Sequence, residues 1–583
     1  MTPKPSERRM RLLAVVAAGG ALAAAATAAT PASAASAPIQ RIQLLAFNDF
    51  HGNLEPPSGS GGRIQTGTSS TGAAINVDAG GAAYLSTHLK TLRAGERDSF
   101  TVSSGDLIGA SPLLSAAFHD EPTIEAHNLM DVDLGVVGNH EFDEGVAELQ
   151  RIQKGGCIRD DEGANNQNSC PAKDLGGKRF RGADFPYLAA NVEYTATGKT
   201  IFSATHVEKF HQGAKVGFIG VVTKTTPSIV TASGVAGLTF TDEADTINRY
   251  AAQLQAQGVQ AIVAVIHEGG SQSGLYNACN NLAGSVLGLN NRISSSVDVL
   301  LNAHTHAGYN CKLNDPAGNP RVVIQGASAG RLISEVDLAF DRRTGDVNRA
   351  QTTATNHIVT RTVAADPAIT SLIDRYKGYL GPIAGRQLGT IASGLTAAQN
   401  ANGESQLGDI LADAAKADAS VTGNGPIEVG FINPGGIRSD LPYGDGVVTY
   451  EEAFTVQPFS NYVVSKTLKG SDLKAVLEQQ FDNPGVGQTR ILGVSGITYS
   501  WSASAPKGSK VSNVLVNGQP LDLNRGYRVA GNNFLLEGGD NFTTFAQGTA
   551  TLYGGLDIEA FASYLEANAP LAPPALNRIT RLP

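Results

Sequence analysis

Five apolar stretches of the chain end in side chains that are able to bind divalent metal ions. A lone histidine in such a place is more often a hydrogen-bonded turn residue, because turns favour small polar side chains. Here, however, five of the chain's 11 histidines gather at these ends with carboxylates and an amide, a donor set of the kind that two catalytic ions require. Mixed nitrogen and oxygen donors suit zinc or manganese better than an all-oxygen site would. The side chains are Asp49, His51, Asp106, Asn139, His140, His267, His304 and His306.

The stretch from residue 132 to residue 143 shows this pattern most clearly. It reads VDLGVVGNHEFD, so a β-branched apolar run stops at Gly138, and an amide, an imidazole and a carboxylate follow. An apolar run of this length fits a buried strand, and the glycine at its end marks a tight turn. Asp143 lies three residues after His140, a spacing at which its carboxylate can fix the tautomer of the imidazole.

Two of these ends carry a pair of ligands that are two residues apart. The pairs are Asp49 with His51 and His304 with His306. In an extended strand, residues two apart point the same way, so we expect both side chains of each pair to reach one ion. Asp106 is suited to bridge two ions, while the neutral Asn139 adds a ligand without further negative charge.

Strands that alternate with helices must bring these side chains together. This alternation indicates a sheet with packed crossovers, arranged as two layers of sheet between helices. The carboxyl ends of parallel strands meet at one edge of a sheet, so we expect the donors to converge there. The Gly/Ser/Thr-rich residues 58–81 predict a surface loop. The expected strands cover residues 40–48, 100–103, 215–222, 261–266 and 297–301, and the expected helices cover residues 82–93, 112–130 and 241–257.

Length and charge limit the architecture and the partners. A chain of 583 residues is too long for one compact core, which favours two large domains. We predict a metal-binding domain at residues 39–360, a connecting helix at 361–384 and a second α/β domain at 385–583. The net charge of −9 argues against a nucleic-acid or anionic-membrane partner, so an anionic substrate needs a local cationic site.

The N-terminus has the pattern of an export signal over residues 1–34. Arg8 and Arg9 precede the alanine-rich apolar residues 12–29, and small residues suited to cleavage follow at 32–34. A transmembrane anchor is the alternative, but the alanine-rich run favours a cleaved signal of the Sec or twin-arginine type. We therefore expect a secreted, extracellular protein without a membrane span.

Four cysteines indicate two disulfides. They allow three pairings, and we favour Cys157 with Cys170 and Cys279 with Cys311 because each pair then closes a local loop. A zinc site is the rival interpretation, but the chain lacks the Cys-x-x-Cys pair that is typical of one.

The order and spelling of the ligand motifs resemble the calcineurin-like metallophosphoesterases. The strings are Asp49-Phe50-His51, Gly105-Asp106, Gly138-Asn139-His140-Glu141-Phe142-Asp143, His267 and His304-Thr305-His306. With the long second domain, nearly all of the mature chain resembles the secreted 5′-nucleotidase family, which includes UDP-sugar hydrolases and 2′,3′-cyclic-nucleotide phosphodiesterases. The resemblance implies a four-layer αββα sandwich followed by an α/β substrate-binding domain.

The resemblance also implies a dinuclear metal site. One ion would be held by Asp49, His51, Asp106 and His306, and the other by Asp106, Asn139, His267 and His304. His140 resembles the histidine that stabilises the transition state, with Asp143 orienting it, and Asn139 also touches the substrate. A hydroxide bound by the ions would attack phosphorus in line, while the ions and the imidazole offset charge on the phosphoryl oxygens.

The second domain supplies the nucleotide contacts that the resemblance implies. Asn433 and Arg438 resemble residues that contact the substrate phosphate, and Asp540 resembles the acceptor of the ribose hydroxyls. Phe459 and Phe534 resemble two aromatics that sandwich the base, and stacking tolerates any base, which predicts broad base specificity. Taken alone, Arg438 would be interpreted as a solvated loop residue and Phe459 as part of the core.

One departure from the family pattern affects the phosphate site. Many family members carry an arginine a few residues before the helix that begins with Leu407-Gly408-Asp409, whereas residues 400–406 of this chain contain none. We therefore expect one phosphate contact to be absent or to come from elsewhere.

Together these features predict an exported metallophosphoesterase that hydrolyses nucleotides, nucleoside 5′-monophosphates foremost. The alternatives are a cyclic-nucleotide phosphodiesterase, a nucleotide-sugar diphosphatase, an extracellular nuclease and a nucleotide-binding module with an inactive site. A nuclease should show a basic groove, which the acidic net charge disfavours. A binding module has no need of a full ligand set with a histidine–aspartate pair.

Overall fold

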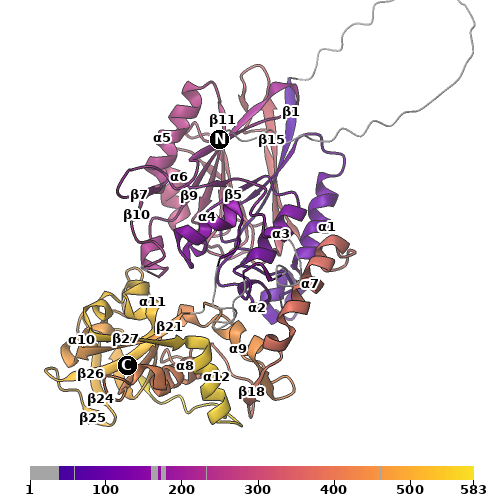
Figure 1. Ribbon diagram of the computed structural model, residues 1–583. Coiled ribbons are helices and arrows are strands. Elements are labelled where there is room, and N and C mark those ends of the chain that lie inside the picture. Colours follow the sequence, from indigo (N-terminus) through magenta and orange to yellow (C-terminus); the bar gives the residue numbers. More distant parts are fainter. Residues whose placement is uncertain (1–37, 58, 159–168, 172–178, 232, 460) are drawn as a thin grey trace, which may run out of the picture. The chain divides into compact units, whose positions relative to one another are not determined.

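Two large β-sheets lie face to face in the first part of the computed structural model, with helices against their outer faces (Figure 1). The structure describes residues 38–583 except 58, 159–168, 172–178, 232 and 460. The predicted signal at residues 1–34 lies outside the described residues. Among the helices of the described part, none combines the length and the apolar character needed to cross a membrane.

The first sheet is mixed and has seven strands. They are β1 (Ile39–Phe47), β4 (Ser99–Ser103), β5 (Leu134–Val136), β6 (Tyr187–Leu188), β15 (Leu332–Asp341), β16 (Asp346–Val347) and β17 (Thr353–Ile358). The strands β1, β4, β5 and β6 are parallel neighbours in that order, whereas β15 pairs antiparallel with β1, β16 and β17. The carboxyl ends of β1, β4 and β5 therefore meet at one edge.

The second sheet has six strands and a parallel centre. They are β8 (Thr205–Lys209), β9 (Lys215–Val222), β11 (Ala261–His267), β12 (Val299–Asn302), β13 (Tyr309–Asn314) and β14 (Pro320–Gln325). The strands β9, β11, β12 and β14 are parallel, and β8 and β13 close the two ends as antiparallel strands.

Burial on both faces explains the uninterrupted apolar run of β11. Val263 and Val265 pack between the two sheets, in one cluster with Leu44 of β1, while Ile262 and Ile266 face the helices outside. Central parallel strands are covered on both sides, so they lack the alternation of half-exposed strands. The outer helices are α1 (Ala82–Arg93), α2 (Leu113–Ala116), α3 (Glu121–Leu129) and α4 (Val146–Lys154) on the first sheet, and α5 (Glu243–Ala256) and α6 (Ser285–Arg292) on the second. The predicted αββα sandwich is confirmed.

A second α/β region follows the long helix α7 (Pro367–Ala384). Its main sheet is β22 (Gly493–Ser495), β19 (Val429–Ile432), β26 (Gly526–Asn532), β21 (Tyr462–Lys469) and β27 (Thr549–Leu556), in that order. A four-stranded sheet contains β25 (Gln519–Pro520), β24 (Val511–Val516), β23 (Ile497–Ser502) and β28 (Ile579–Leu582). The helices are α8 (Gln406–Ala417), α9 (Tyr450–Val456), α10 (Gly470–Glu478), α11 (Asn533–Leu536) and α12 (Asp557–Ala567).

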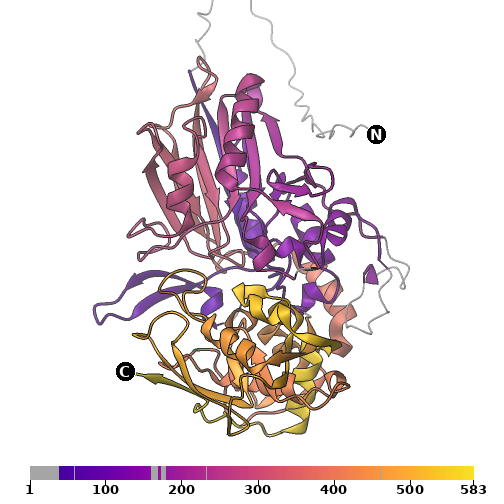
Figure 2. The same ribbon diagram turned by 90° about the vertical axis from the view of Figure 1, so that its left-hand side faces the viewer.

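Three further strand pairs lie outside these sheets. They are β7 (Val192–Tyr194) with β10 (Leu238–Phe240), β18 (Gln387–Thr390) with β20 (Val447–Thr449), and β2 (Arg63–Thr68) with β3 (Ala74–Asp78). The last pair corrects the predicted loop at residues 58–81, because Ile64 pairs with Val77 and turns the segment into a hairpin. Figure 2 shows this hairpin, in indigo, projecting away from the neighbouring strands.

Both predicted disulfides are confirmed. Cys157 bonds to Cys170 and Cys279 to Cys311, with Cα atoms 5.6 and 5.2 Å apart.

Candidate active site

The predicted metal ligands converge at the carboxyl ends of the parallel strands. Their ligand atoms form three overlapping groups, in each of which all atoms lie within 4.8 Å of one another. The groups are Asp49 with His51 and His306, His51 with Asp106 and His140, and Asp106 with His267 and His304. Residues that are about 250 positions apart in the sequence thus meet at one point.

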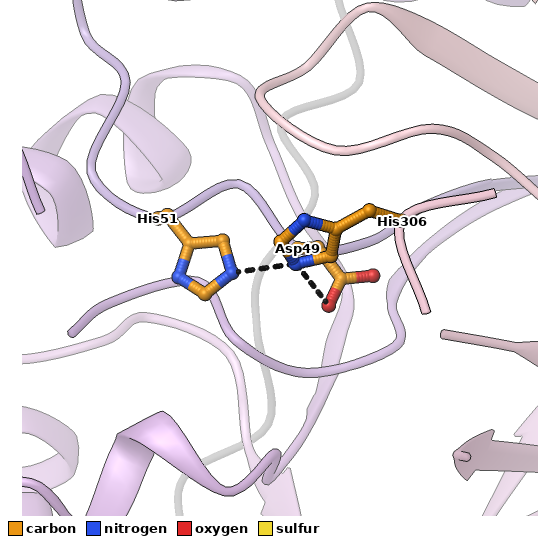
Figure 3. Close-up of side chains that lie close together, drawn as sticks. All are labelled: Asp49, His51 and His306. Carbon is orange, nitrogen blue, oxygen red and sulfur yellow. Dashed lines mark hydrogen bonds and ion pairs between the residues drawn. The ribbon is translucent and has the colours of Figure 1, made fainter. Parts of the chain in front are cut away.

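The first group is drawn in Figure 3, where the two rings and the carboxylate point toward one another. His51 Nε2 lies 3.1 Å from His306 Nε2, and His306 Nε2 lies 3.5 Å from Asp49 Oδ1. The Nδ1 atom of His51 is 2.9 Å from the carbonyl oxygen of Gly109, which leaves Nε2 as the ligand atom. Such an outer hydrogen bond is what fixes the orientation of a metal-binding imidazole.

Asp106 lies between the two sets of imidazoles. Its Oδ2 atom is 3.7 Å from His51 Nε2 and 3.1 Å from His267 Nε2. His267 Nε2 is also 3.1 Å from the Oδ1 atom of Asn139, and its Nδ1 atom faces the carbonyl oxygen of Ser104 at 2.9 Å. Asp106 therefore lies between His51 and His267, and Asn139 lies beside His267.

The donor chemistry fits divalent cations. Buried carboxylates of this kind must be paired or bound to metal. Asp49 and Asp106 face imidazole nitrogens and also accept hydrogen bonds from backbone N–H groups. Burial lowers the pKa of His51 to about 3, so this imidazole is neutral, as a metal ligand must be. Burial also opposes charge on His267, but Asp106 and Asp49 outweigh it and raise that pKa to about 10. A cation at this point competes with a proton for the nitrogen of His267.

The backbone at the ligands departs from the extended form that we expected. The φ angles are 49° at Asp49, 47° at His51, 51° at Asp106, 73° at His304 and 56° at His306. These left-handed values are uncommon for residues with a side chain and cluster at functional sites. The expectation that His304 and His306 reach one ion is wrong, because the turn sends them to different groups.

His140 lies beside the metal ligands and is held from two sides. Its Nδ1 atom is 2.8 Å from Asp143 Oδ2, and its backbone N–H donates to Asp106 Oδ1 at 2.9 Å. Burial opposes charge on the ring, but the Asp143 and Asp106 carboxylates outweigh burial and raise the pKa of His140. The pair that the spacing predicted is thus present.

Glu141 is a positioning residue that our sequence analysis did not single out. Its buried carboxylate accepts hydrogen bonds from the backbone N–H groups of Asp106, Leu107 and Gly138. It thereby ties the turn after β4 to the turn after β5. An acidic residue inside an otherwise buried turn is the signal that could have pointed to it.

A cavity of about 220 Å³ opens beside the metal ligands. The second α/β region contributes all of its predicted contacts to this cavity, and Asn139 also lines it. Three residues of the loop at 229–231, together with Asn461, Arg490 and Asn532, also line the cavity and were not predicted. The predicted residues in the lining are Asn139, His140, Asp143, His304, Asn433, Arg438, Phe459, Phe534 and Asp540.

Arg438 and Phe459 lie at the end of the cavity that faces the metal ligands. The guanidinium carbon of Arg438 is 5.5 Å from the centre of the Phe459 ring, and that ring is 5.9 Å from the ring of His140. Asn433 lies farther along. Its Nδ2 atom donates to Asp540 Oδ2 at 2.9 Å, and its Oδ1 atom accepts from Asn532 at 3.2 Å.

Comparison with known proteins identifies the family. The description "5′-nucleotidase, C-terminal domain" matches residues 384–547. The cell wall protein Lmo0130 of Listeria monocytogenes is 31% identical over 558 residues, covering 90% of this chain and 67% of that protein. The chain belongs to the 5′-nucleotidase family.

Two further relatives give the fold and the extent of the match. The crystal structure of a 5′-nucleotidase precursor from Thermus thermophilus superposes with a TM-score of 0.71 at 24% identity, covering 93% of this chain and 99% of that one. It confirms that this 5′-nucleotidase-family chain has the mixed α/β two-domain fold. Endonuclease YhcR of Bacillus subtilis is 28% identical over 534 residues, covering 91% of this chain and 40% of the endonuclease. The chain thus spans less than half of that relative.

Proposed function

We propose that this protein hydrolyses the phosphate esters of nucleotides, nucleoside 5′-monophosphates foremost, with two divalent ions. The observation that carries the proposal is the cavity itself. It brings the His140–Asp143 pair and the ligand His304 together with the cation of Arg438 and two aromatic rings. A phosphate, a sugar and a base each find a chemically suitable neighbour there.

The metal ligands divide between two ions in this proposal. Asp49, His51, Asp106 and His306 would hold one, and Asp106, Asn139, His267 and His304 the other. When bound, ions of this kind lower the pKa of water and withdraw charge from phosphoryl oxygens. Zinc and manganese both suit the mixed donors.

The protein's own groups bind and orient the substrate. The carboxylates beside His140 raise its pKa and favour the protonated ring, in which Nδ1–H donates to Asp143 and Nε2–H would donate to a phosphoryl oxygen that gains charge. The Arg438 guanidinium is suited to bidentate contact with phosphate. Phe459 and Phe534 would hold the base by stacking, worth roughly 1–3 kcal/mol. Asn433 would contact the phosphate together with Arg438. Asp540, whose Oδ2 atom accepts from Nδ2 of Asn433, would face the sugar.

The same proposal includes the domain boundaries and the cellular location of the protein. Residues 39–360 would form the metal domain and residues 385–583 the nucleotide domain, joined through 361–384. Two disulfides and the cell-wall relative support an extracellular protein exported by its N-terminal signal.

Phosphate release from a panel of substrates tests this function. The panel is AMP, ADP, UDP-glucose, 2′,3′-cyclic AMP, bis-p-nitrophenyl phosphate and DNA, each with and without chelator. We expect AMP to be hydrolysed faster than UDP-glucose, the cyclic and synthetic diesters and DNA, and we expect chelator or Asp106→Ala to abolish release. Asp78→Ala, which alters an exposed carboxylate in the hairpin, is the control. Activity that survives both chelator and Asp106→Ala would contradict the proposal of two catalytic ions.

A nuclease is the second candidate, favoured by the similarity to the Bacillus endonuclease. Cleavage of DNA faster than AMP would favour it.

The variant Arg438→Ala tests the role of Arg438. An equal loss of monoester and diester hydrolysis would contradict its assignment to the terminal phosphate.

A further inference from the structure

Arg490 and Asp540 form an ion pair in the wall of the cavity. Nη1 of Arg490 donates to Oδ1 of Asp540. The other carboxylate oxygen, Oδ2, accepts from Nδ2 of Asn433 at 2.9 Å. Both oxygens of Asp540 therefore have a partner inside the protein before any substrate arrives.

Arg490 has N–H groups beside the cavity that are able to donate further hydrogen bonds. Its side chain is 27% exposed and lines the cavity. Within the part of the chain that the structure describes, Nε and Nη2 of Arg490 form no hydrogen bond. A guanidinium is always charged and only donates, so these atoms suit an anionic acceptor.

The two arginines of the cavity lie in different electrostatic surroundings. Arg438 lies over the ring of Phe459, which in turn stacks beside His140 at the metal end. Arg490 has Asp540 as its ion-pair partner instead. The phosphoryl group that reacts must lie at the metal end, so Arg490 meets another part of the substrate.

Packing holds Arg490 in this position. Its backbone N–H donates to the carbonyl oxygen of Gln480 at 2.8 Å. The next residue, Ile491, packs against Gly403, where φ is 90° and an added Cβ would lie 2.6 Å from Cγ1 of Ile491. Nε2 of Gln399 also donates to the carbonyl oxygen of Ile491, at 2.9 Å. The segment without an arginine before α8 therefore contacts the segment that supplies Arg490.

We propose that Arg490 binds a second phosphoryl group of the substrate, separate from the group that is hydrolysed. The inference rests on the proposed nucleotide hydrolysis and names a substrate class for it. Two kinds of nucleotide carry such a group. In adenosine 3′,5′-bisphosphate it lies across the ribose, and in ADP it lies in the phosphate chain.

Competing substrates and an arginine variant test this inference. For the wild type, we expect kcat/KM for adenosine 3′,5′-bisphosphate or for ADP to exceed that for AMP by about tenfold or more, as a charged hydrogen bond allows. Arg490→Gln should remove this preference and leave AMP within about threefold. Arg490→Lys keeps the charge and should retain part of the preference. The nucleotide that loses most in Arg490→Gln identifies where the second phosphate lies.

The control is Arg525→Gln, because Arg525 pairs with Glu428 on the surface of the same region. It should leave the ratio of substrates unchanged. An equal loss for AMP and for both doubly phosphorylated nucleotides would overturn the proposal, as would a wild type without preference. If the wild type releases phosphate from no nucleotide, the proposed function fails. In that case, calorimetry on Asp106→Ala and on the double variant Asp106→Ala/Arg490→Gln still measures the affinity for the bisphosphate and for AMP. It then shows whether Arg490 makes the bisphosphate bind more tightly than AMP.

Discussion

Replacing Glu141 by glutamine tests how the turns that carry the metal ligands are held together. The Glu141 side chain is 2% exposed. Its Oε2 atom accepts from the backbone N–H groups of Asp106, at 2.9 Å, and of Gly138, while Oε1 accepts from Leu107 at 2.8 Å. Glutamine has the same shape, but it replaces one acceptor oxygen by an NH2 group.

The size of the effect follows from this geometry. The glutamine amide can place its oxygen at the position of Oε2, which keeps the hydrogen bonds from the N–H groups of Asp106 and Gly138. Its NH2 group then lies at the position of Oε1 and faces the N–H of Leu107, so that hydrogen bond is lost. A buried backbone N–H left without an acceptor lowers stability by roughly 1–3 kcal/mol. We expect Glu141→Gln to lower the free energy of unfolding by about 2 kcal/mol.

Three measurements check this expectation. Denaturant titration gives the free energy of unfolding, mass spectrometry gives the bound metal, and phosphate release gives the activity. Because Asp106 is the proposed bridging ligand, metal affinity should fall by about 10–100-fold, as happens when a group behind a ligand is lost. Glu96→Gln, at an exposed position, is the control. Unchanged unfolding free energy together with unchanged metal content in Glu141→Gln would refute the reasoning.

Three further predictions concern chemistry, crosslinking and pH. His140→Ala should lower kcat by about 10²–10⁴ with bound metal unchanged, and a parallel loss of metal would contradict its role beside the ligands. Serine at both Cys279 and Cys311, 32 residues apart, should lower the free energy of unfolding by about 3–4 kcal/mol in denaturant titration. Burial opposes charge on His119, but Glu144 outweighs it and raises the pKa to about 9. The stability that the His119–Glu144 pair adds is complete below about pH 6.5 and is lost as the pH rises through 9. The free energy of unfolding of the wild type should therefore fall by about 2 kcal/mol more over this pH range than that of His119→Gln. Equal pH profiles of the unfolding free energy for both proteins would contradict this expectation.

Much of the metal centre could be predicted because its parts leave strong local signals. An uninterrupted apolar run such as residues 261–266 is typical of a parallel strand that is buried on both faces. Histidines and carboxylates placed after several such runs must then meet at one edge of the sheet. The Cys279–Cys311 pairing was predictable for a related reason, because short loops close most easily.

Other features depend on contacts that no local pattern records. The left-handed backbone at Asp49 and His51 arises from the turn that follows β1 and bonds to the turn after β4. The pairing of Ile64 with Val77 makes a hairpin of a segment whose composition resembles a loop. Arg490 follows an exposed glycine-containing loop, and only the packing of Ile491 brings it to the cavity.

The five proposed ligands with positive φ connect the metal site to folding. Each such residue is less stable than in an ordinary conformation by roughly 1 kcal/mol or more, so together they oppose folding by about 5 kcal/mol whether or not an ion is bound. An ion that binds only the native chain, at a hundred times its dissociation constant, would return about 2.7 kcal/mol. The proposed ions would therefore offset part of this backbone strain, and their removal would lower the free energy of unfolding.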